Sequence, residues 1–348
     1  MWPVMLAFML GMVKQEHIED MWRILLLVVI IQVPMVFYQY FMVAKQSIRM
    51  SPWDAVVGTF PGQEGGGGQS AAMATFLLIA MLAAIALWRH KALSGKYLIL
   101  LLLSGIGTLA LAEVKAAVLL LPLVVVAYYR REILLRPFES LVFFMAAMLL
   151  VGGLFVGYEH FHYSGRQGSI LNPNLPNTTM DRVLREIDPH NESPLTHQIG
   201  RVTHLVYWWD INVKGGDYQH TLFGYGMGST QITNIGVGDL AKRFPYPLDV
   251  TSSTILLWET GIIGHIAFLF ILLTGAWVSG RMAKQPCVPE MHKIFLRVGA
   301  IGLFLLAITL PYKNFAFRSI PIQFLMMLML GQAAYWYRQA HSSPIKAW

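Results

Sequence analysis

With 348 residues, 55% of them hydrophobic and only 13% charged, the chain has about half the charged fraction of a soluble protein, which is roughly 25%. This composition argues against a soluble globular protein and predicts an all-α polytopic membrane protein. The formal charge of +7 does not indicate nucleic-acid binding, because basic residues cluster beside apolar runs, as at cytoplasmic loop ends: Trp88-Arg89-His90-Lys91, Tyr129-Arg130-Arg131, and Arg281 with Lys284. Cys287 is the only cysteine, so no intramolecular disulfide forms, and we interpret it as incidental.

Apolar runs that could cross a bilayer recur along the chain. A crossing helix needs about 20 residues, and runs of about that length lie at 22–42, 71–88, 141–158, 254–278, 295–312 and 320–337. The opening run 2–13 is shorter, which predicts the end of a helix that starts upstream, so that the chain is N-terminally incomplete. No cleavable signal peptide is expected, because the chain opens on Trp2-Pro3 without a basic region.

Residues 97–129 form an apolar stretch that is too long for one crossing. A single helix of this length would extend about 50 Å at roughly 1.5 Å per residue. Glu113-Val114-Lys115 interrupts the stretch, and basic residues flank both ends, at Lys96 and at Arg130-Arg131. We expect a helical hairpin with its outer tip at 113–115, because a hairpin places both basic flanks in the cytoplasm. One long helix is the alternative.

The basic clusters then predict the orientation of the whole chain. Cytoplasmic segments are 89–96, 130–138, 279–294 and the C-terminal tail, and outer segments are 43–70, 113–115, 159–253 and 313–319. We therefore predict about eight or nine spans, arranged as N-terminal membrane helices (1–158), one large, partly helical outer loop (159–253) and C-terminal membrane helices (254–348).

The two longer outer segments differ in character. Gly65 to Gly68 predicts a flexible linker, because consecutive glycines are costly to order; a gate or a close approach of backbone to ligand is the alternative. The large loop is too long for a mere connector. It predicts one helix starting near Thr179, and a second from Leu195 to Trp209 whose aromatic, amphipathic pattern suits the membrane interface.

No metal ion or other cofactor is expected. His160 and His162 are separated by one residue at the start of the large loop, but no further histidine or acidic residues recur at the spacing of a metal site.

Cations on the outer side form the first candidate site. Ionisable residues at membrane depth usually face a cavity or a partner, and a diphosphate is bound well by several arginines and lysines. The alternative is that Lys115 pairs with Glu113 or snorkels and that Lys313 and Arg318 are interface anchors. The candidates are Lys115, Arg201, Lys242-Arg243, Lys313 and Arg318.

The second candidate site lies around the span that starts near residue 254. Asp249 could cap this helix or act as a general base for a sugar hydroxyl, whereas Glu259 is expected to be a buried, hydrogen-bonded acid. The preceding glycine turn at 223–228, which contains Tyr225 and Gly226, lacks the Lys-Ser/Thr pair of a phosphate loop and is interpreted as a turn that could contact substrate.

Several of these segments occur in an order that resembles a known family. They are Gly200-Arg201 with Trp208, LFGYGMGS at 222–229, and LLWETGIIG at 256–264. Together they resemble the O-antigen ligase and polysaccharide polymerase superfamily of bacterial inner membranes. Val57-Gly58-Thr59-Phe60 is similar to another family segment, and Lys115 lies at the hairpin tip where ligases carry an arginine. The resemblance covers roughly residues 50–335.

The resemblance implies a GT-C-type bundle that transfers a glycan from an undecaprenyl-diphosphate carrier at the periplasmic face, without metal or nucleotide sugar. It implies that Arg201 and Lys115 bind the diphosphate, and we assign Arg243, Lys313, Arg318, Tyr225 and Gly226 to the same substrate. Expected partners are the lipid-linked oligosaccharide, membrane lipids, a flippase and a chain-length regulator, with no nucleic acid.

One departure from the family pattern bears on the reaction. Ligases carry a His-Asn pair shortly before the Glu-x-Gly motif, where this chain has Val250 and Thr251. Asp249 is then the nearest candidate base, and the departure favours a polymerase over a ligase. The hypothesis from a different class is a transporter or flippase for lipid-linked sugars, which predicts repeated halves with broken helices; a glycan-binding assembly subunit is the third.

Overall fold

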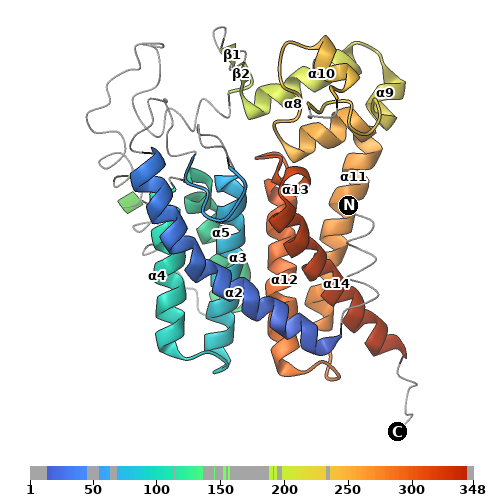
Figure 1. Ribbon diagram of the computed structural model, residues 1–348. Helices are drawn as coiled ribbons and strands as arrows, with labels where there is room; N and C mark the ends of the chain where they lie inside the picture. Colours follow the sequence, from blue (N-terminus) through green and yellow to red (C-terminus); the bar gives the residue numbers. More distant parts are fainter. Residues whose placement is uncertain are drawn as a thin grey trace. The chain divides into compact units, whose positions relative to one another are not determined.

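The computed structural model describes residues 14–44, 55–62, 69–112, 114–135, 188–190, 192–193, 198–232 and 236–342, with single positions between 145 and 156. The chain divides into two compact units (Figure 1). We call them the helix unit (Met1–His162, Leu273–Leu306 and Ser319–Trp348) and the loop unit (Tyr163–Leu272 and Ala307–Arg318). The predicted run at 2–13, most of that at 141–158, the helix near Thr179, Gly65 to Gly68, and His160 with His162 lie outside the described residues.

The described part of the chain is almost entirely helical, as the composition predicts. It contains four helices that are long and apolar enough to cross a membrane: Gln15–Ala44, Ser70–Arg89, Ser252–Met282 and Glu290–Thr309. The predicted run at 320–337 forms a helix as well, but this helix is not among the four, because Gln323 and Gln332 interrupt its apolar sequence. The protein is therefore a helical membrane protein.

The helices of the helix unit begin and end close to the predicted runs. Their bounds are α2 Gln15–Tyr38, continued by the π-helical turn η1 Gln39–Ala44, then α3 Ser70–Arg89, α4 Gly95–Leu111, α5 Lys115–Leu135, α12 Glu290–Thr309 and α14 Ile320–Ser342. The predicted interruption within 97–129 is confirmed, because α4 ends at Leu111 and α5 begins at Lys115.

The core of the helix unit combines small side chains with large aliphatic and aromatic ones. Helix α3 is buried along most of its length, and its many alanines allow neighbouring helices to approach closely. Trp22 of α2 stacks on Phe295 of α12 with 5.2 Å between ring centroids, and its indole nitrogen donates to Gln332 of α14 at 3.0 Å. This contact satisfies the polar end of a buried tryptophan.

The segment 55–62 of the helix unit is held against α2 by two glutamine side chains. Gln39 accepts from the backbone nitrogens of Val57 and Gly58 at 2.9 and 2.7 Å, and Gln32 accepts from that of Thr59 at 2.8 Å. Gly58 has φ +63°, and a Cβ there would collide with the Gln32 amide oxygen. Side-chain hydrogen bonds therefore fix the Val57-Gly58-Thr59 turn.

The loop unit contains shorter elements. They are β1 Glu192–Ser193 paired antiparallel with β2 Gln198–Ile199, α8 Arg201–Trp209 with the π-helical turn η4 Asp210–Lys214, α9 Tyr218–Phe223, α10 Asp239–Arg243, α11 Ser252–Met282 and α13 Phe315–Arg318. The prediction of a helix beginning at Leu195 is wrong: α8 begins at Arg201, because Gln198 and Ile199 are in β2 and Gly200 provides the extended N-cap.

Helix α11 is broken near its beginning. Gly261 has φ +67° and ψ −169°, which interrupts the helical hydrogen bonds and leaves backbone groups of the preceding turn without partners inside the helix. The first part of the helix is surrounded by α8, α9 and α10, and Trp258 lies fully buried with Trp208, Leu240 and Leu248 (Figure 1). The loop unit therefore folds around the beginning of a membrane-spanning helix.

Candidate functional site

The N-terminus of α11 is held by the turn at 310–314. The backbone nitrogens of Ser252 and Ser253 donate to the carbonyl oxygens of Lys313 and Leu310, at 3.1 and 3.0 Å. Thr251 caps the helix: the Thr254 nitrogen donates to the Thr251 hydroxyl, and the Thr251 nitrogen to the Thr254 hydroxyl, both at 3.1 Å. The alternative in which Asp249 caps this helix is therefore wrong.

Asp249 instead forms an ion pair within the same region. Its Oδ2 accepts from a guanidinium nitrogen of Arg318 on α13, and its backbone oxygen accepts from the side-chain amide of Asn314 at 2.7 Å. Both charged side chains are partly exposed, at 26% for Asp249 and 28% for Arg318. The pair is therefore positioned but reachable from solvent.

Arg201 contacts the same turn at 310–314 through Tyr312. The guanidinium lies over the ring of Tyr312, with 4.2 Å to the centroid, a cation–π arrangement. Arg201 is also the first residue of α8, where the helix dipole disfavours a positive charge. The contact with Tyr312 therefore holds the guanidinium of Arg201 at this end of the helix.

We call Arg201, Asp249, Tyr312, Lys313 and Arg318 the cationic cluster. It contains three cationic side chains, Arg201, Lys313 and Arg318, and one carboxylate, Asp249. All five residues are at least partly accessible. Stacked guanidinium groups are weakly hydrated and well shaped for phosphate oxygens. The arrangement can therefore bind an anion such as a diphosphate.

The glycine turn at 223–228 packs on the broken part of α11. The backbone nitrogens of Tyr225 and Gly226 donate to the oxygens of Trp258 and Glu259 at 2.8 and 3.0 Å. Gly224, with φ +71°, allows the approach: a Cβ there would lie 2.6 Å from the Glu259 oxygen. The two segments of the resemblance, LFGYGMGS and LLWETGIIG, are therefore in contact.

Glu259 has the predicted structural role. Its side chain is 5% exposed, and Oε1 accepts from the Thr230 hydroxyl at 2.6 Å. Because a buried carboxylate needs hydrogen-bond partners, this contact explains why the acid is tolerated inside the loop unit. It also ties the residues after the glycine turn to α11.

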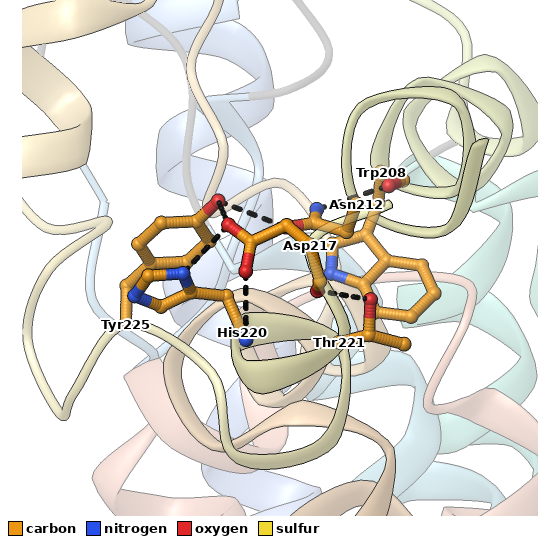
Figure 2. A network of polar contacts seen from close by, with 6 residues as sticks. All are labelled: Trp208, Asn212, Asp217, His220, Thr221 and Tyr225. Atoms are coloured by element: carbon orange, nitrogen blue, oxygen red, sulfur yellow. Dashed lines mark hydrogen bonds and ion pairs between the residues drawn. The ribbon is translucent and has the colours of Figure 1, made fainter. Parts of the chain in front are cut away.

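A second group of polar residues surrounds Asp217, as Figure 2 shows. Asp217 Oδ2 pairs with His220 Nδ1 at 2.7 Å and accepts from the Tyr225 hydroxyl at 3.4 Å, while Asn212 Oδ1 accepts from the same hydroxyl at 2.9 Å. The His220 and Tyr225 rings stack with centroids 3.9 Å apart. We call Asn212, Asp217, His220 and Tyr225 the aspartate network.

The aspartate network stabilises the local structure of the loop unit. Asp217 is also the N-cap of α9, accepting from the His220 nitrogen at 3.2 Å, and Asn212 donates to the Trp208 oxygen at 3.0 Å. The network thereby connects η4, α9 and the glycine turn. Because the Tyr225 hydroxyl is already bonded, its contacts give it a structural role, and contact with substrate stays a prediction for both Tyr225 and Gly226.

The environment shifts three pKa values in the loop unit. Hydrogen bonds from His220 lower the pKa of Asp217, and burial, followed by the charge of Asp217, raises the pKa of Tyr225. Burial lowers the pKa of His204 to about 4, and its two ring nitrogens have no hydrogen-bond partner in the described structure. His204 is therefore neutral at pH 7, one turn along α8 from Arg201.

The remaining predicted site residues are placed less closely. Arg243 is exposed at the end of α10, and its charge acts on the Tyr225 hydroxyl. Lys115 is the first residue of α5 in the helix unit, so its part in the site stays a prediction. Among the described residues, no group of three His, Cys, Asp or Glu side chains is placed to hold a metal ion.

Sequence reasoning missed three contributors: Tyr312, Asn314 and the Asp217–His220 pair. Tyr312 and Asn314 are distant in sequence from the residues that they contact, so no local pattern could reveal them. Asp217 and His220, at i and i+3 before an apolar stretch, do carry the signature of a helix N-cap.

The fold and composition define the class as a helical membrane protein with a cationic cluster in its loop unit. Comparison with known proteins adds no family: no family model matches the sequence, and no curated protein or solved structure does so either.

Proposed function

We propose that the protein is a metal-independent glycan polymerase of the bacterial inner membrane. It joins oligosaccharide repeat units carried on undecaprenyl diphosphate into an O-antigen or exopolysaccharide at the periplasmic face. The proposed architecture is a GT-C-like bundle of about eight or nine spans, with the cationic cluster facing the periplasm. A flippase would supply the substrate and a chain-length regulator would control the product.

The observation that carries the proposal is the cationic cluster. Arg201 stacks on Tyr312, and the Arg318–Asp249 pair and Lys313 belong to the same turn and helix start. Arginine and lysine side chains at one turn fit a lipid diphosphate, and the resemblance of the surrounding segments to glycan polymerases and ligases supplies the reaction class.

The reaction balances without a cofactor. A hydroxyl oxygen of one lipid-linked unit attacks the anomeric carbon of another, and the bond from that carbon to the diphosphate oxygen breaks. The electron pair leaves with the diphosphate, whose charge Arg201, Lys313 and Arg318 stabilise. Asp249 accepts the hydroxyl proton at Oδ1, because only Oδ2 and its backbone oxygen have polar partners among the described residues. In this scheme Arg318 also orients the base.

The test uses purified protein in nanodiscs with an undecaprenyl-diphosphate-linked oligosaccharide, chelator and no nucleotide. We expect a ladder of products on a gel and release of undecaprenyl diphosphate in equal number to the new bonds. Transfer of a single block to a different acceptor would instead indicate a ligase. Movement of the lipid-linked sugar across a vesicle bilayer without bond formation would contradict enzyme function and indicate a transporter.

A further inference from the structure

Large apolar side chains are exposed on α9 and the glycine turn of the loop unit. Phe223 is 64% exposed and Met227 is 90% exposed, and Leu222 and Tyr218 are exposed as well. A folded protein rarely leaves several large apolar groups of one short segment in water without a partner. The backbone of this segment is fastened by the aspartate network, so the exposure belongs to an ordered part of the fold.

The exposure of α11 changes at its break. Residues from Ser252 to Glu259 are mostly buried within the loop unit, whereas Ile263, Ile266 and Phe270 are all exposed. Exposed isoleucine and phenylalanine side chains are suited to the lipid-facing surface of a membrane-spanning helix. The break at Gly261 therefore lies near the level at which α11 passes from protein surroundings into the bilayer.

The exposed segment lies at this same level, because Gly261 is packed against it. A Cβ on Gly261 would lie 2.6 Å from the backbone nitrogen of Phe223. The Leu222–Phe223 backbone thus touches α11 two residues before the first lipid-facing side chain, Ile263. The exposed side chains of Leu222 and Phe223 therefore belong to a segment that packs directly against α11 at its break.

The residues around the exposed segment suit the membrane boundary. Trp209 is half-exposed at the end of α8, and tryptophan and tyrosine are favoured at the level of the lipid headgroups. Lys214 is exposed nearby in sequence and pairs with Asp210 at 2.7 Å, and an ammonium group at this level can also reach lipid phosphates.

We propose that α9 and the glycine turn rest on the outer leaflet, with Leu222, Phe223 and Met227 inserted between lipids beside the Gly261 break of α11. This contact fixes the height of the loop unit above the bilayer. The proposal rests on the membrane class and on the packing of Gly261, and it holds whether or not the protein transfers glycans.

The test measures membrane depth with single spin labels in nanodiscs. Cys287 is first replaced by serine, and single cysteines are then introduced by Phe223→Cys and Met227→Cys. Ile263→Cys serves as the lipid-facing reference and Lys242→Cys as the water-facing reference. Each label is exposed in turn to oxygen, which concentrates in the bilayer, and to a water-soluble nickel chelate.

At positions 223 and 227 we expect an oxygen-to-nickel collision ratio several-fold above that at 242 and approaching that at 263. A ratio equal to that at 242 would overturn the proposal, since the segment would then lie in water. Shielding from both reagents would also overturn it, because another protein or a second copy would cover the segment. Met227 is 90% exposed, so its label does not disturb packing if the Phe223 variant folds poorly.

Discussion

The loop unit contains two polar clusters that differ in how their charges are balanced. In the aspartate network the one carboxylate has a histidine, a tyrosine and a backbone nitrogen as partners. In the cationic cluster Asp249 pairs with Arg318, and Arg201 is stacked on a tyrosine ring. The first arrangement joins its members by hydrogen bonds around one carboxylate, whereas the second is composed mainly of cationic side chains, which suit an anionic ligand.

The difference separates a structural cluster from a candidate site by charge balance alone. A buried or half-buried network that satisfies its own members rigidifies the fold. The cationic cluster brings guanidinium and ammonium groups to one turn, and Arg201 lies at a helix N-terminus, where the helix dipole disfavours a positive charge. Function is therefore expected from the cationic cluster and stability from the aspartate network.

The largest effect is expected from Arg201→Ala. If Arg201 stabilises the departing diphosphate, its removal lowers the rate of polymer formation by about 10²–10³-fold, as for other donors to a developing negative charge. Arg201→Lys keeps the charge but loses the planar group that stacks on Tyr312, so we expect only partial recovery. The measurement is the initial rate of undecaprenyl diphosphate release.

The thermal midpoint of Arg201→Ala in detergent should match that of the unchanged protein, because the helix dipole already disfavours this cation. Normal polymer formation by a stable Arg201→Ala variant would show that the reaction does not need Arg201. The cationic cluster and the aspartate network would then not differ in function.

The next prediction distinguishes two reasons for glycine in the turn at 223–228: close packing against α11 and a positive φ. Gly224 and Gly226 both have positive φ, but a Cβ on Gly224 would press into the backbone at Glu259 and Thr260, whereas a Cβ on Gly226 would meet open space. Gly226→Ala should cost about 1 kcal/mol in the free energy of unfolding, and Gly224→Ala roughly 2 kcal/mol more, because the turn must separate from α11. Tryptophan fluorescence can follow unfolding, since Trp208 and Trp258 lie in this core. An equal decrease in the free energy of unfolding for both variants would show that the turn can move away from α11 at little cost.

The sequence predicts the helices of this chain better than it predicts the partners of its charged residues. Apolar length locates α3 and α11 and the interruption before Lys115, because the bilayer demands about 20 apolar residues per crossing. The local sequence offers Asp249 as a cap of α11, but Thr251 and Thr254 form the cap instead. Its true partners, Arg318 and Asn314, follow more than sixty residues later, and no local periodicity connects such distant positions.

The start of α8 shows a second limit. The spacing of aromatic residues extends the helix back to Leu195, yet Gln198 and Ile199 pair with β1 and leave the helix to begin at Arg201. At residues 198 and 199 the pairing with β1 overrides helix propensity, and no local sequence pattern predicts this pairing. The shift places Arg201 at the N-terminus of α8 rather than within it.

The smallest effect is expected from Asp217→Asn, which keeps the shape of the aspartate network and removes its charge. The pKa of Asp217 is lowered by the His220 hydrogen bonds below its ordinary value of 3.8. A carboxyl group with a lowered pKa in the folded state stabilises the fold above its unfolded pKa and loses this contribution as the pH falls through the folded value. The thermal midpoint of the unchanged protein should therefore exceed that of Asp217→Asn at pH 6, and the difference should shrink below about pH 4.

Polymer formation by Asp217→Asn at pH 7 should stay within a few-fold of normal, since the hydrogen bonds of the aspartate network are complete without a ligand. A loss as large as that of Arg201→Ala, with the fold intact, would make His220 and Asp217 part of the reaction, and charge balance would then no longer distinguish the two clusters.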